Sequence, residues 1–424
     1  MRRLMVLHGV ERHSSWQALR DLDEALAVAE GSRQASAAAA PVHPDARVAD
    51  AYAALVRALI AEDRADPASA LAAAVLEEDN ALGGLERPPQ GLRAAAAADV
   101  ESLQRAVRRD WHADAARLAD ASLPPLKQLA PEPPSGAWES GVAALAAALL
   151  SEPADAVLEW LLARFREHGT GAPARYGALR WRGGGLEGIA HAAAVDGELL
   201  VGVDDQLGRL YTNTEALLAG APAHNALLYG PRGSGKSTAV RSLLPRYQER
   251  GLRLVELPGE ALERLPEVVE RLRRHPQRFV LYVDDLSFEH GDRRYHPLKT
   301  LLEGSLSARP GNVVLYATSN RRHLLRERFS ERPAAGEDDD VHAWDTHNER
   351  LALADRFGLT ITFPSASQRE YLHIVEVLAG HAGVQAPDLV QRAVRFADWG
   401  NGYSGRTARQ FIDAVLQERA AGRA

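Results

Sequence analysis

Five short, continuous runs of apolar residues mark the second half of the chain. Stretches with the 3.6-residue spacing of amphipathic helices separate most of these runs. An uninterrupted apolar run is typical of a strand buried on both faces, and strands that alternate with helices predict a parallel sheet covered by helices. The runs lie at residues 225–229, 252–257, 279–283, 313–317 and 359–363. We therefore expect an α/β domain with a five-stranded parallel sheet over residues 199–366.

Residues 1–168 carry helical stripes rich in Ala, Leu and Arg instead of such runs. The first stripe extends from Trp16 to Leu26. Further helices are expected at residues 51–61, 69–78, 94–107 and 142–150. The pattern predicts an all-α N-terminal region, and no motif assigns chemistry to it. A helical bundle that binds a partner and a scaffold without a separate role both fit this pattern.

Two further segments flank the expected sheet domain. Residues 169–198 read as a linker and lead-in, because a loop-like stretch there closes with the glycines at 183–185. Residues 367–424 turn helical again, with helices expected at residues 370–382, 388–399 and 405–418. The last of these has an apolar face opposite Arg406. A small helical domain is therefore expected after the sheet.

Composition narrows the class of protein. The formal net charge of −7 gives no overall electrostatic case for nucleic acid, so DNA is a possible partner that the charge does not indicate. The absence of cysteine excludes disulfides, thiolate metal sites and thiol catalysis, and it fits a reducing cytoplasm. No apolar run approaches the ~18 residues of a membrane span, and residues 1–8 are too short an apolar start for a secretion signal. We expect a cytoplasmic protein.

The strongest motif begins directly after the first apolar run. Residues 230–237 read Gly-Pro-Arg-Gly-Ser-Gly-Lys-Ser and match the phosphate-binding loop G-x-x-x-x-G-K-[S/T] at every fixed position. A helical face follows from Ala239 to Tyr247, so strand, glycine loop and helix come in the order that the chemistry needs. A glycine-rich hairpin turn is the alternative, and the helical face that follows argues against it.

Each part of this loop has a chemical role towards a nucleotide. Backbone N–H groups and the start of the helix can surround phosphate oxygens. Lys236 can reach the β- and γ-phosphates, and the Ser237 hydroxyl can ligate Mg²⁺. The motif therefore predicts ATP and Mg²⁺ as ligands. The other loop residues expected to contact the nucleotide are Gly230, Pro231, Arg232, Gly233, Ser234, Gly235 and Thr238.

Polar side chains follow two of the later apolar runs. Asp284 and Asp285 close the run at 279–283, and Asn320 follows the run at 313–317. Ligands of open α/β sheets bind at the carboxyl ends of the strands. Asp284 can hold Mg²⁺, Asp285 can orient or deprotonate a water molecule, and Asn320 can position that water near the γ-phosphate. The alternative for all three is a turn-forming role, in which Asp and Asn are common.

These motifs together resemble the AAA+ ATPase superfamily, and within it a family of uncharacterised bacterial proteins predicted to be AAA+ ATPases. The resemblance covers residues from about 195 to 424. The likeness to the superfamily rests on the stretches Gly230–Ser237, Phe279–Asp285, Tyr316–Asn320, Leu353–Gly358 and Ser404–Arg406. The likeness to the particular family rests on Asp284–Glu289, Tyr316–Leu325 and Ser404–Phe411.

The resemblance implies roles for further residues. Residues 201–206, with Val203 among them, would line the base pocket, and residues 367–424 would form a helical lid. Asn320 is similar to the sensor 1 residue. Arg356 resembles an arginine finger that enters a neighbouring subunit's site, and Arg406 resembles sensor 2, which touches the γ-phosphate from the lid. Arg409, one turn further on, is the second candidate for that role.

The chain departs from the superfamily pattern at one catalytic position. Most AAA+ proteins carry Glu where this chain has Asp285, whose side chain is one methylene shorter. Misplacement of a catalytic group by about 1 Å can cost about 10²-fold in rate. Hydrolysis is therefore expected to be slow without a partner, and Glu289 is a second candidate for this role.

By this resemblance we expect an ATPase that remodels or loads an unidentified macromolecular partner as a homo-oligomeric ring or open helix. A nucleotide-dependent switch or scaffold with little turnover is the alternative, and phosphate transfer to a small molecule ranks last. The isolated histidines His43, His112 and His168 are interpreted as surface or packing residues. The acidic cluster at 337–340 is interpreted as a solvated loop, with a metal site as the alternative.

Overall fold

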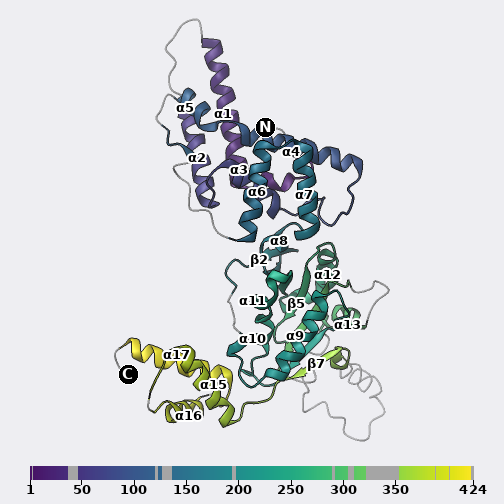
Figure 1. The fold of residues 1–424 in the computed structure, drawn as a ribbon, viewed down its shortest axis with the longest axis vertical. Coiled ribbons are helices and arrows are strands. Elements are labelled where there is room, and N and C mark those ends of the chain that lie inside the picture. The colour runs from purple at the N-terminus through teal and green to yellow at the C-terminus, as the bar shows by residue number, and fades with distance from the viewer. Residues whose placement is uncertain are drawn as a thin grey trace. The chain divides into compact units, whose positions relative to one another are not determined.

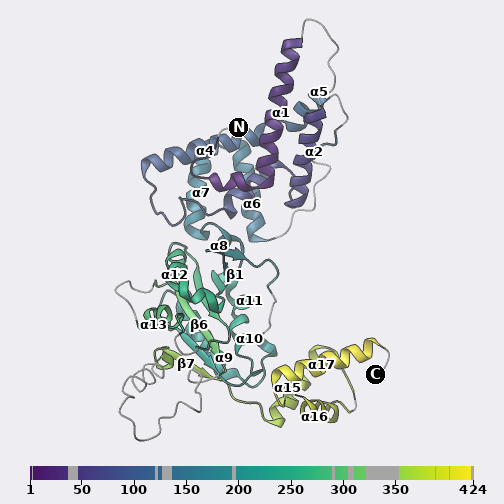
Figure 2. The same cartoon turned by 180° about the vertical axis from the view of Figure 1, so that it is seen from behind.

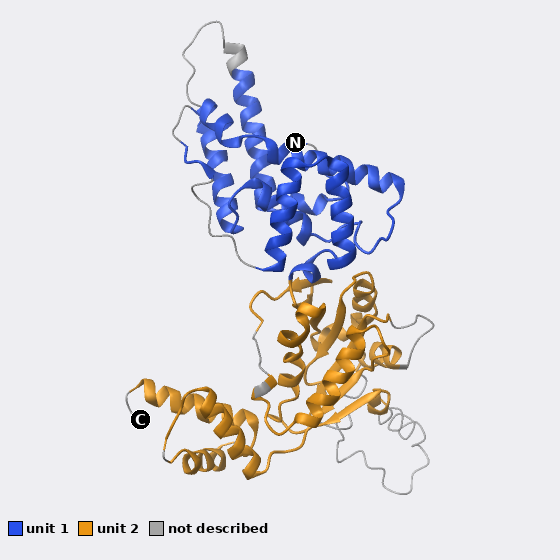
Figure 3. Cartoon of the chain, in the orientation of Figure 1, with its two compact units in different colours: residues 1–175 blue, residues 176–424 orange. Residues whose placement is uncertain are grey.

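A computed structural model of the protein describes two compact units, Met1–Arg175 and Tyr176–Ala424, each of which is considered by itself (Figure 3). Within the described residues, no helix is both long and apolar enough to cross a membrane. The residues that the structure describes are 1, 3–36, 46–119, 123–126, 136–192, 197–288, 292–303, 310–320, 353–386, 388–400 and 402–421.

The elements described in the first unit are helices (Figure 1). Their apolar stripes meet in one core, in which Leu19, Leu55 and Leu103 have no exposed surface. The elements are η1 (His8–Arg12), α1 (Ser14–Ser36), α2 (Ala46–Ala61), α3 (Pro67–Glu77), α4 (Gln90–Arg108), α5 (Trp111–Ala119), α6 (Ala137–Ser151), α7 (Ala154–His168) and α8 (Ala172–Arg175).

Helix α3 lies at the centre of this unit, because nearly all of its residues are buried. Asp66 begins it by accepting a hydrogen bond from the backbone N–H of Ser69 at 2.9 Å, and Pro67 occupies the first helical position, where its missing N–H has no partner to lose. Local sequence therefore determines where the most buried helix starts.

Two carboxylates attach the start of the chain to later helices. Asp99 on α4 is buried and accepts hydrogen bonds from the backbone N–H groups of Met5, Val6 and Leu7 at 2.7 to 3.0 Å. Such bonds satisfy amide groups that would otherwise be buried without a partner. The irregular first turn is therefore held against α4.

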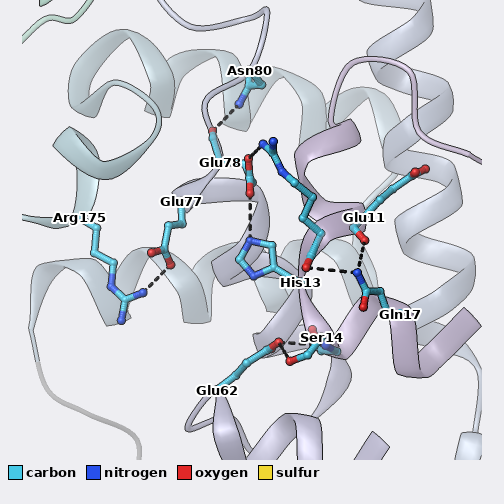
Figure 4. Close-up of polar contacts among 11 residues, drawn as sticks. Glu11, His13, Ser14, Gln17, Glu62, Glu77, Glu78, Asn80 and Arg175 are labelled. Atoms are coloured by element: carbon cyan, nitrogen blue, oxygen red, sulfur yellow. Dashed lines mark hydrogen bonds and ion pairs between the residues drawn. The ribbon is translucent and has the colours of Figure 1, made fainter. Parts of the chain in front are cut away.

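The second carboxylate, Glu78, follows the end of α3 and contacts two basic side chains from the start of the chain. Arg12 donates to it at 2.7 Å, and the ring of His13 points at it with Nε2 at 3.3 Å (Figure 4). This contact with Glu78 raises the pKa of His13, with the charges of Glu62 and Glu77 adding to it against the effect of burial. The same contact lowers the pKa of Glu78.

The second unit is built on a seven-stranded sheet with the order β2-β1-β4-β5-β6-β3-β7. All neighbouring strands are parallel except the β1–β2 hairpin. The strands are β1 (Ala178–Arg182), β2 (Gly185–Gly188), β3 (Ala226–Tyr229), β4 (Leu252–Glu256), β5 (Arg278–Val283), β6 (Val313–Ser319) and β7 (Leu359–Thr362).

Helices cover both faces of this sheet (Figures 1 and 2). On one face Leu210, Val240 and Leu243 pack against strand residues such as Leu228 and Val280. On the other, α12 contacts β6 and α13. The helical elements of this unit are η3 (Gly197–Leu199), α9 (Asp204–Leu218), α10 (Lys236–Arg241), α11 (Leu243–Tyr247), η4 (Gln248–Arg250), η5 (Gly259–Arg264), α12 (Leu265–Arg273), α13 (Tyr295–Glu303), α15 (Gln368–His381), α16 (Leu389–Trp399) and α17 (Gly405–Ala420). The predicted α/β fold with a largely parallel sheet is confirmed.

The predicted count of five strands is wrong. The five apolar runs correspond to β3 to β7, but β1 and β2 lie within residues 169–198, which we expected to be a linker and lead-in. In β1, Leu179 and Trp181 are buried while Arg180 and Arg182 are exposed, which is the alternation of a strand with one covered face. Gly183 and Gly184 make the hairpin turn, and Gly185 is the first residue of β2.

Three helices follow β7 and pack around a core of their own. Tyr371, Val375 and Phe411 are among its buried residues. Ser367 and Glu370 cap α15 reciprocally, since the Ser367 hydroxyl accepts from the N–H of Glu370 and the Glu370 carboxylate accepts from the N–H of Ser367. Helices α15, α16 and α17 begin and end within a few residues of the predicted positions.

Candidate functional site

A pocket of about 760 Å³ opens at the carboxyl ends of β3, β5 and β6, between the sheet and the three C-terminal helices. Crevices at strand ends are where open α/β sheets bind ligands. The pocket brings together seven separate parts of the sequence. They are residues 199–203, residues 231–238, Asp284 with Asp285, Thr318 with Asn320, residues 364–366, side chains of α15, and side chains of α17 with the turn before it.

The glycine loop joins β3 to α10 and forms the floor of this pocket. Gly230 and Gly233 both have positive φ angles, of 154° and 78°. A Cβ at Gly230 would lie 2.2 Å from the carbonyl oxygen of Phe363, and one at Gly233 would lie 2.8 Å from the Ser404 hydroxyl. Only glycine fits these two positions, so the loop backbone can approach both β7 and the start of α17.

Lys236 is the first residue of α10 and is largely buried. Its Nζ donates to the carbonyl oxygens of Gly230 at 2.8 Å and Pro231 at 2.7 Å, and to Oδ1 of Asn320 at 3.2 Å. Burial lowers the pKa of Lys236, while the nearby carboxylates of Asp284 and Asp285 oppose that effect. The ammonium therefore stands inside the loop, within reach of both acidic residues.

Asp284 accepts two hydrogen bonds on the same oxygen. Ser237 Oγ donates to its Oδ1 at 2.7 Å and Thr318 Oγ1 donates at 2.6 Å, while the guanidinium of Arg241 is 3.8 Å from its other oxygen. Burial alone would raise the pKa of Asp284, but these hydrogen bonds outweigh it and hold the pKa below its ordinary value. Asp284 is therefore a carboxylate at neutral pH.

Asp285 has a different environment from its neighbour. Its backbone is left-handed, with φ 51°, and its N–H donates to Thr318 Oγ1 at 3.0 Å. Its Oδ1 accepts a hydrogen bond from Asn320 Nδ2 at 2.6 Å. Asn320 thus bridges Asp285 and Lys236, and the two polar strand ends of β5 and β6 meet as the sequence predicted.

The oxygen atoms of this site fit a magnesium ion. The Ser237 hydroxyl and the Asp284 carboxylate are 2.7 Å apart, and both are oxygen donors of the kind that Mg²⁺ prefers. No group of three or more His, Asp or Glu side chains suited to a metal occurs in the part of the chain that the structure describes. This donor set suits Mg²⁺, which is usually held by one or two carboxylates together with phosphates rather than by an all-protein cage.

The wall of the pocket also contains apolar and basic side chains. The apolar residues are Leu200, Val203, Ile374 and Leu378, and the basic residues include Arg406 and Arg409 on α17. An apolar slot can accept the flat face of a base, and guanidinium groups suit phosphate oxygens. Val203, Arg406 and Arg409, named from the resemblance, all line the pocket.

Other candidates lie outside this pocket. Arg356 follows a helical turn at residues 353–355 and is half-buried, but it does not line the pocket. His112 contacts the carbonyl of Leu123 at 3.0 Å, which is a packing role. His168 lies in the first unit beside Glu167. Glu289, His43 and the acidic cluster at 337–340 fall outside the described residues.

Sequence reasoning missed several residues of the site. Thr318 and Arg241 contact Asp284 directly, and Leu200, Ile374 and Leu378 line the apolar wall. Thr318 could have been found, since it occupies the end of β6 two residues before Asn320. The apolar wall carries no motif, because any small set of apolar side chains can make such a surface.

The sequence matches the model of one protein family over more than half of its length. Residues 174–419 match the model of a family described as "Protein of unknown function (DUF815)", which confirms the predicted resemblance to such a family. No curated protein matches the sequence.

Among solved structures, the chain is similar to the Aeropyrum pernix Orc1 protein in complex with DNA, at 17% identity and a TM-score of 0.38, covering 52% of this chain and 61% of that chain. The chain therefore spans about three fifths of the length of Orc1. It is also similar to the Thermotoga maritima RuvB Holliday junction branch migration motor, at 14% identity and a TM-score of 0.32, covering 52% of this chain and 72% of that chain.

Proposed function

The chain belongs to the family described as "Protein of unknown function (DUF815)", and on that premise we propose that it is an AAA+ protein that binds ATP with Mg²⁺ and hydrolyses it to remodel or load a macromolecular partner. One observation carries the proposal. A glycine loop, the Ser237–Asp284 oxygen pair and the Asp285–Asn320 pair converge on one pocket at the strand ends. These are the parts that phosphoryl transfer to water requires.

Each residue has a defined task in this proposal. The loop amides and Lys236 bind the β- and γ-phosphates, for which the Nζ must leave the carbonyls of Gly230 and Pro231. Ser237 and Asp284 would hold Mg²⁺, which neutralises charge on the phosphates when bound. Asp285 and Asn320 orient the attacking water, and Asp285 accepts its proton.

The C-terminal helices also contribute to the pocket. Arg406 lines it beside the loop, since a Cβ at Gly233 would lie 3.1 Å from the Cβ of Arg406, and its guanidinium can pair with a γ-phosphate oxygen. Arg409 lines the same wall one turn further along α17. Because the pocket lies between the sheet and these helices, closing it around a nucleotide would exclude water and bring Arg406 to the reacting phosphate.

The test of nucleotide binding is the variant Lys236→Ala. It should abolish tight ATP binding in calorimetry while the unfolding transition stays in place, because the loop backbone remains and only the ammonium is removed. Lys299→Ala, which removes the lysine of α13 outside the pocket, is the matched control and should bind ATP like the parent protein. Unchanged affinity in Lys236→Ala would exclude this loop as the phosphate site.

A switch or scaffold with little turnover is the second candidate function. The Asp285 side chain is one methylene shorter than that of glutamate, and its Oδ1 already accepts a hydrogen bond from Asn320 at 2.6 Å. The carboxylate must therefore exchange this partner before it can act on water. A steady-state phosphate-release assay separates the two functions. Continuous release above the background of Lys236→Ala supports an ATPase, whereas tight ATP binding without release supports the switch.

A further inference from the structure

The turn that follows β5 has an unusual backbone. Among the described residues, only Asp63 and Asp285 combine a side chain with a positive φ angle. Left-handed backbone costs energy for side chains in general, and Asp and Asn adopt it several-fold more often than other residues because a short polar side chain can bond locally. Asp285 is therefore one of the residue types that tolerate the backbone of this turn.

One buried side chain holds this turn in place. Thr318, at 1% exposure, lies on β6 next to the end of β5. Its hydroxyl donates to Asp284 Oδ1 at 2.6 Å and accepts from the N–H of Asp285 at 3.0 Å. Its carbonyl oxygen accepts from the N–H of Leu286 at 2.7 Å. Thr318 is therefore bonded to each of three consecutive residues of the turn.

The Thr318 hydroxyl acts as a donor to one aspartate and as an acceptor from the next. A threonine hydroxyl has a single proton to donate, and here that proton is used on Asp284. Its lone pair then faces the amide of Asp285, and the branched Cβ restricts rotation of the side chain. The hydroxyl thus sets the position of the Asp284 carboxylate and the backbone of Asp285 relative to each other.

We propose that Thr318 is a positioning residue for the two acidic groups, and that its hydroxyl aligns the Asp284 carboxylate with Ser237 and the Asp285 carboxylate with Asn320. This inference rests on the proposed ATP hydrolysis and extends it to a residue that acts through Asp284 and Asp285. Partners that orient a metal ligand or a catalytic group from behind typically contribute about 10- to 100-fold to affinity or activity.

The test compares Thr318→Val, which keeps the branched shape and removes the hydroxyl, with Thr318→Ser, which keeps the hydroxyl. Thr318→Val should lower kcat for ATP by about 10- to 100-fold with little change in KM, because phosphate binding by the loop is retained. Thr318→Ser should recover most of this loss.

Hydrogen exchange adds a measurement that needs no nucleotide. The amide of Asp285 should exchange faster in Thr318→Val than in the parent protein or in Thr318→Ser, since only the valine lacks the acceptor for that N–H. Thr214→Val is the matched control. It removes another fully buried hydroxyl of the same unit, which bonds Leu210 and Tyr316 away from the pocket, and it should leave kcat and the Asp285 amide unchanged.

The outcomes separate this inference from the function beneath it. A parent protein that neither binds ATP nor releases phosphate overturns the proposed function, and the catalytic role of Thr318 with it. An active parent with an equally active Thr318→Val overturns the role of Thr318 alone. Equal losses in Thr318→Ser and Thr318→Val also overturn it, because the shape of the side chain rather than the hydroxyl would then be responsible.

Discussion

At the scale of single residues, two adjacent aspartates are placed in different surroundings. Asp284 shares one oxygen between the hydroxyls of Ser237 and Thr318, whereas Asp285 is bonded to the amide of Asn320. The first arrangement suits a metal ligand, because a hydroxyl and a carboxylate oxygen face each other. The second suits a group that handles water, because an amide can hold both a carboxylate and a water molecule. Substitutions at the two positions should therefore have different effects.

Asp284→Ala should lose the Mg²⁺-dependent tightening of ATP binding, because it removes the carboxylate that faces Ser237. Asp285→Asn should bind Mg²⁺-ATP nearly as well as the parent protein, yet release phosphate at least about 10²-fold more slowly. Asparagine tolerates the left-handed backbone at this position, so the second variant should fold normally. Calorimetry with and without Mg²⁺ and a phosphate-release assay measure the two effects. Equal turnover in Asp285→Asn and the parent would move the catalytic role elsewhere, with Glu289 the first residue to test.

The phosphate loop and the polar strand ends could be predicted because each needs particular residue types at fixed spacings. Lys236, Asp284, Asp285 and Asn320 lie in one pocket as expected. The position of Thr318 at a strand end could also have been predicted, but its bonds to Asp284 and Asp285 could not. They depend on a backbone angle at Asp285 and on which strand lies beside β5, and neither is encoded in a local pattern.

At the scale of elements, the strands β3 to β7 were found, including β7 at one edge of the sheet, whereas β1 and β2 at the other edge were not. β3 to β6 are apolar along most of their length, so their runs stand out in the sequence. β1 is short, and Arg180 and Arg182 alternate with its buried residues, so its apolar signal covers one face alone. Its place beside β4 depends on pairing with a strand some 70 residues later, which no local pattern reveals.

The His13–Glu78 contact ties the start of α1 to the end of α3, and its strength should depend on pH. Folding raises the pKa of His13 above its ordinary 6.5, so this contribution is fully present below that pH and is lost as pH rises through the raised value. Folding lowers the pKa of Glu78 below its ordinary 4.5, so its contribution is lost as pH falls through the lowered value. Both groups therefore stabilise the unit together between these two ordinary values.

As pH rises from the ordinary 6.5 through the raised pKa of His13, the free energy of unfolding of the parent protein should fall more steeply than that of His13→Gln, because only the parent loses a charge pair over this interval. Urea unfolding of the full chain at several pH values measures the difference. His112→Gln is the control, since His112 faces a backbone carbonyl rather than a carboxylate. Parallel pH profiles for the parent and His13→Gln would show that the contact contributes nothing to stability.

At the scale of the whole molecule, the proposed mechanism needs more than one chain. Arg356 is half-buried after the turn at 353–355 and does not line the pocket of its own chain. As the arginine finger that the resemblance implies, it would stabilise charge on a γ-phosphate in a neighbouring subunit. Contacts of this head-to-tail kind build rings or open helices. The alternative is a surface ion pair, which would contribute about 1 kcal/mol at most.

Arg356→Ala should lower turnover by about 10³-fold or more if the finger acts between subunits. Mixing it with Lys236→Ala should restore part of the activity, because some interfaces then pair an intact loop with an intact finger. Arg57→Ala, an exposed arginine of α2, is the control and should leave turnover unchanged. Turnover per chain that is flat across protein concentration, with a monomer in the presence of an ATP analogue, would rule this mechanism out.

The close approach of Gly230 to the carbonyl of Phe363 has a mechanical consequence. Phe363 is the last residue before the segment that lines the pocket and leads to Ser367, the cap of α15. The first residue of the phosphate loop therefore abuts the root of the C-terminal helices, with no side chain between the two backbones to absorb movement. When the ammonium of Lys236 leaves the carbonyl oxygen of Gly230 to bind a phosphate, we expect any shift of the Gly230 backbone to be passed directly to the backbone of Phe363. The phosphate loop and the C-terminal helices would then move together rather than independently.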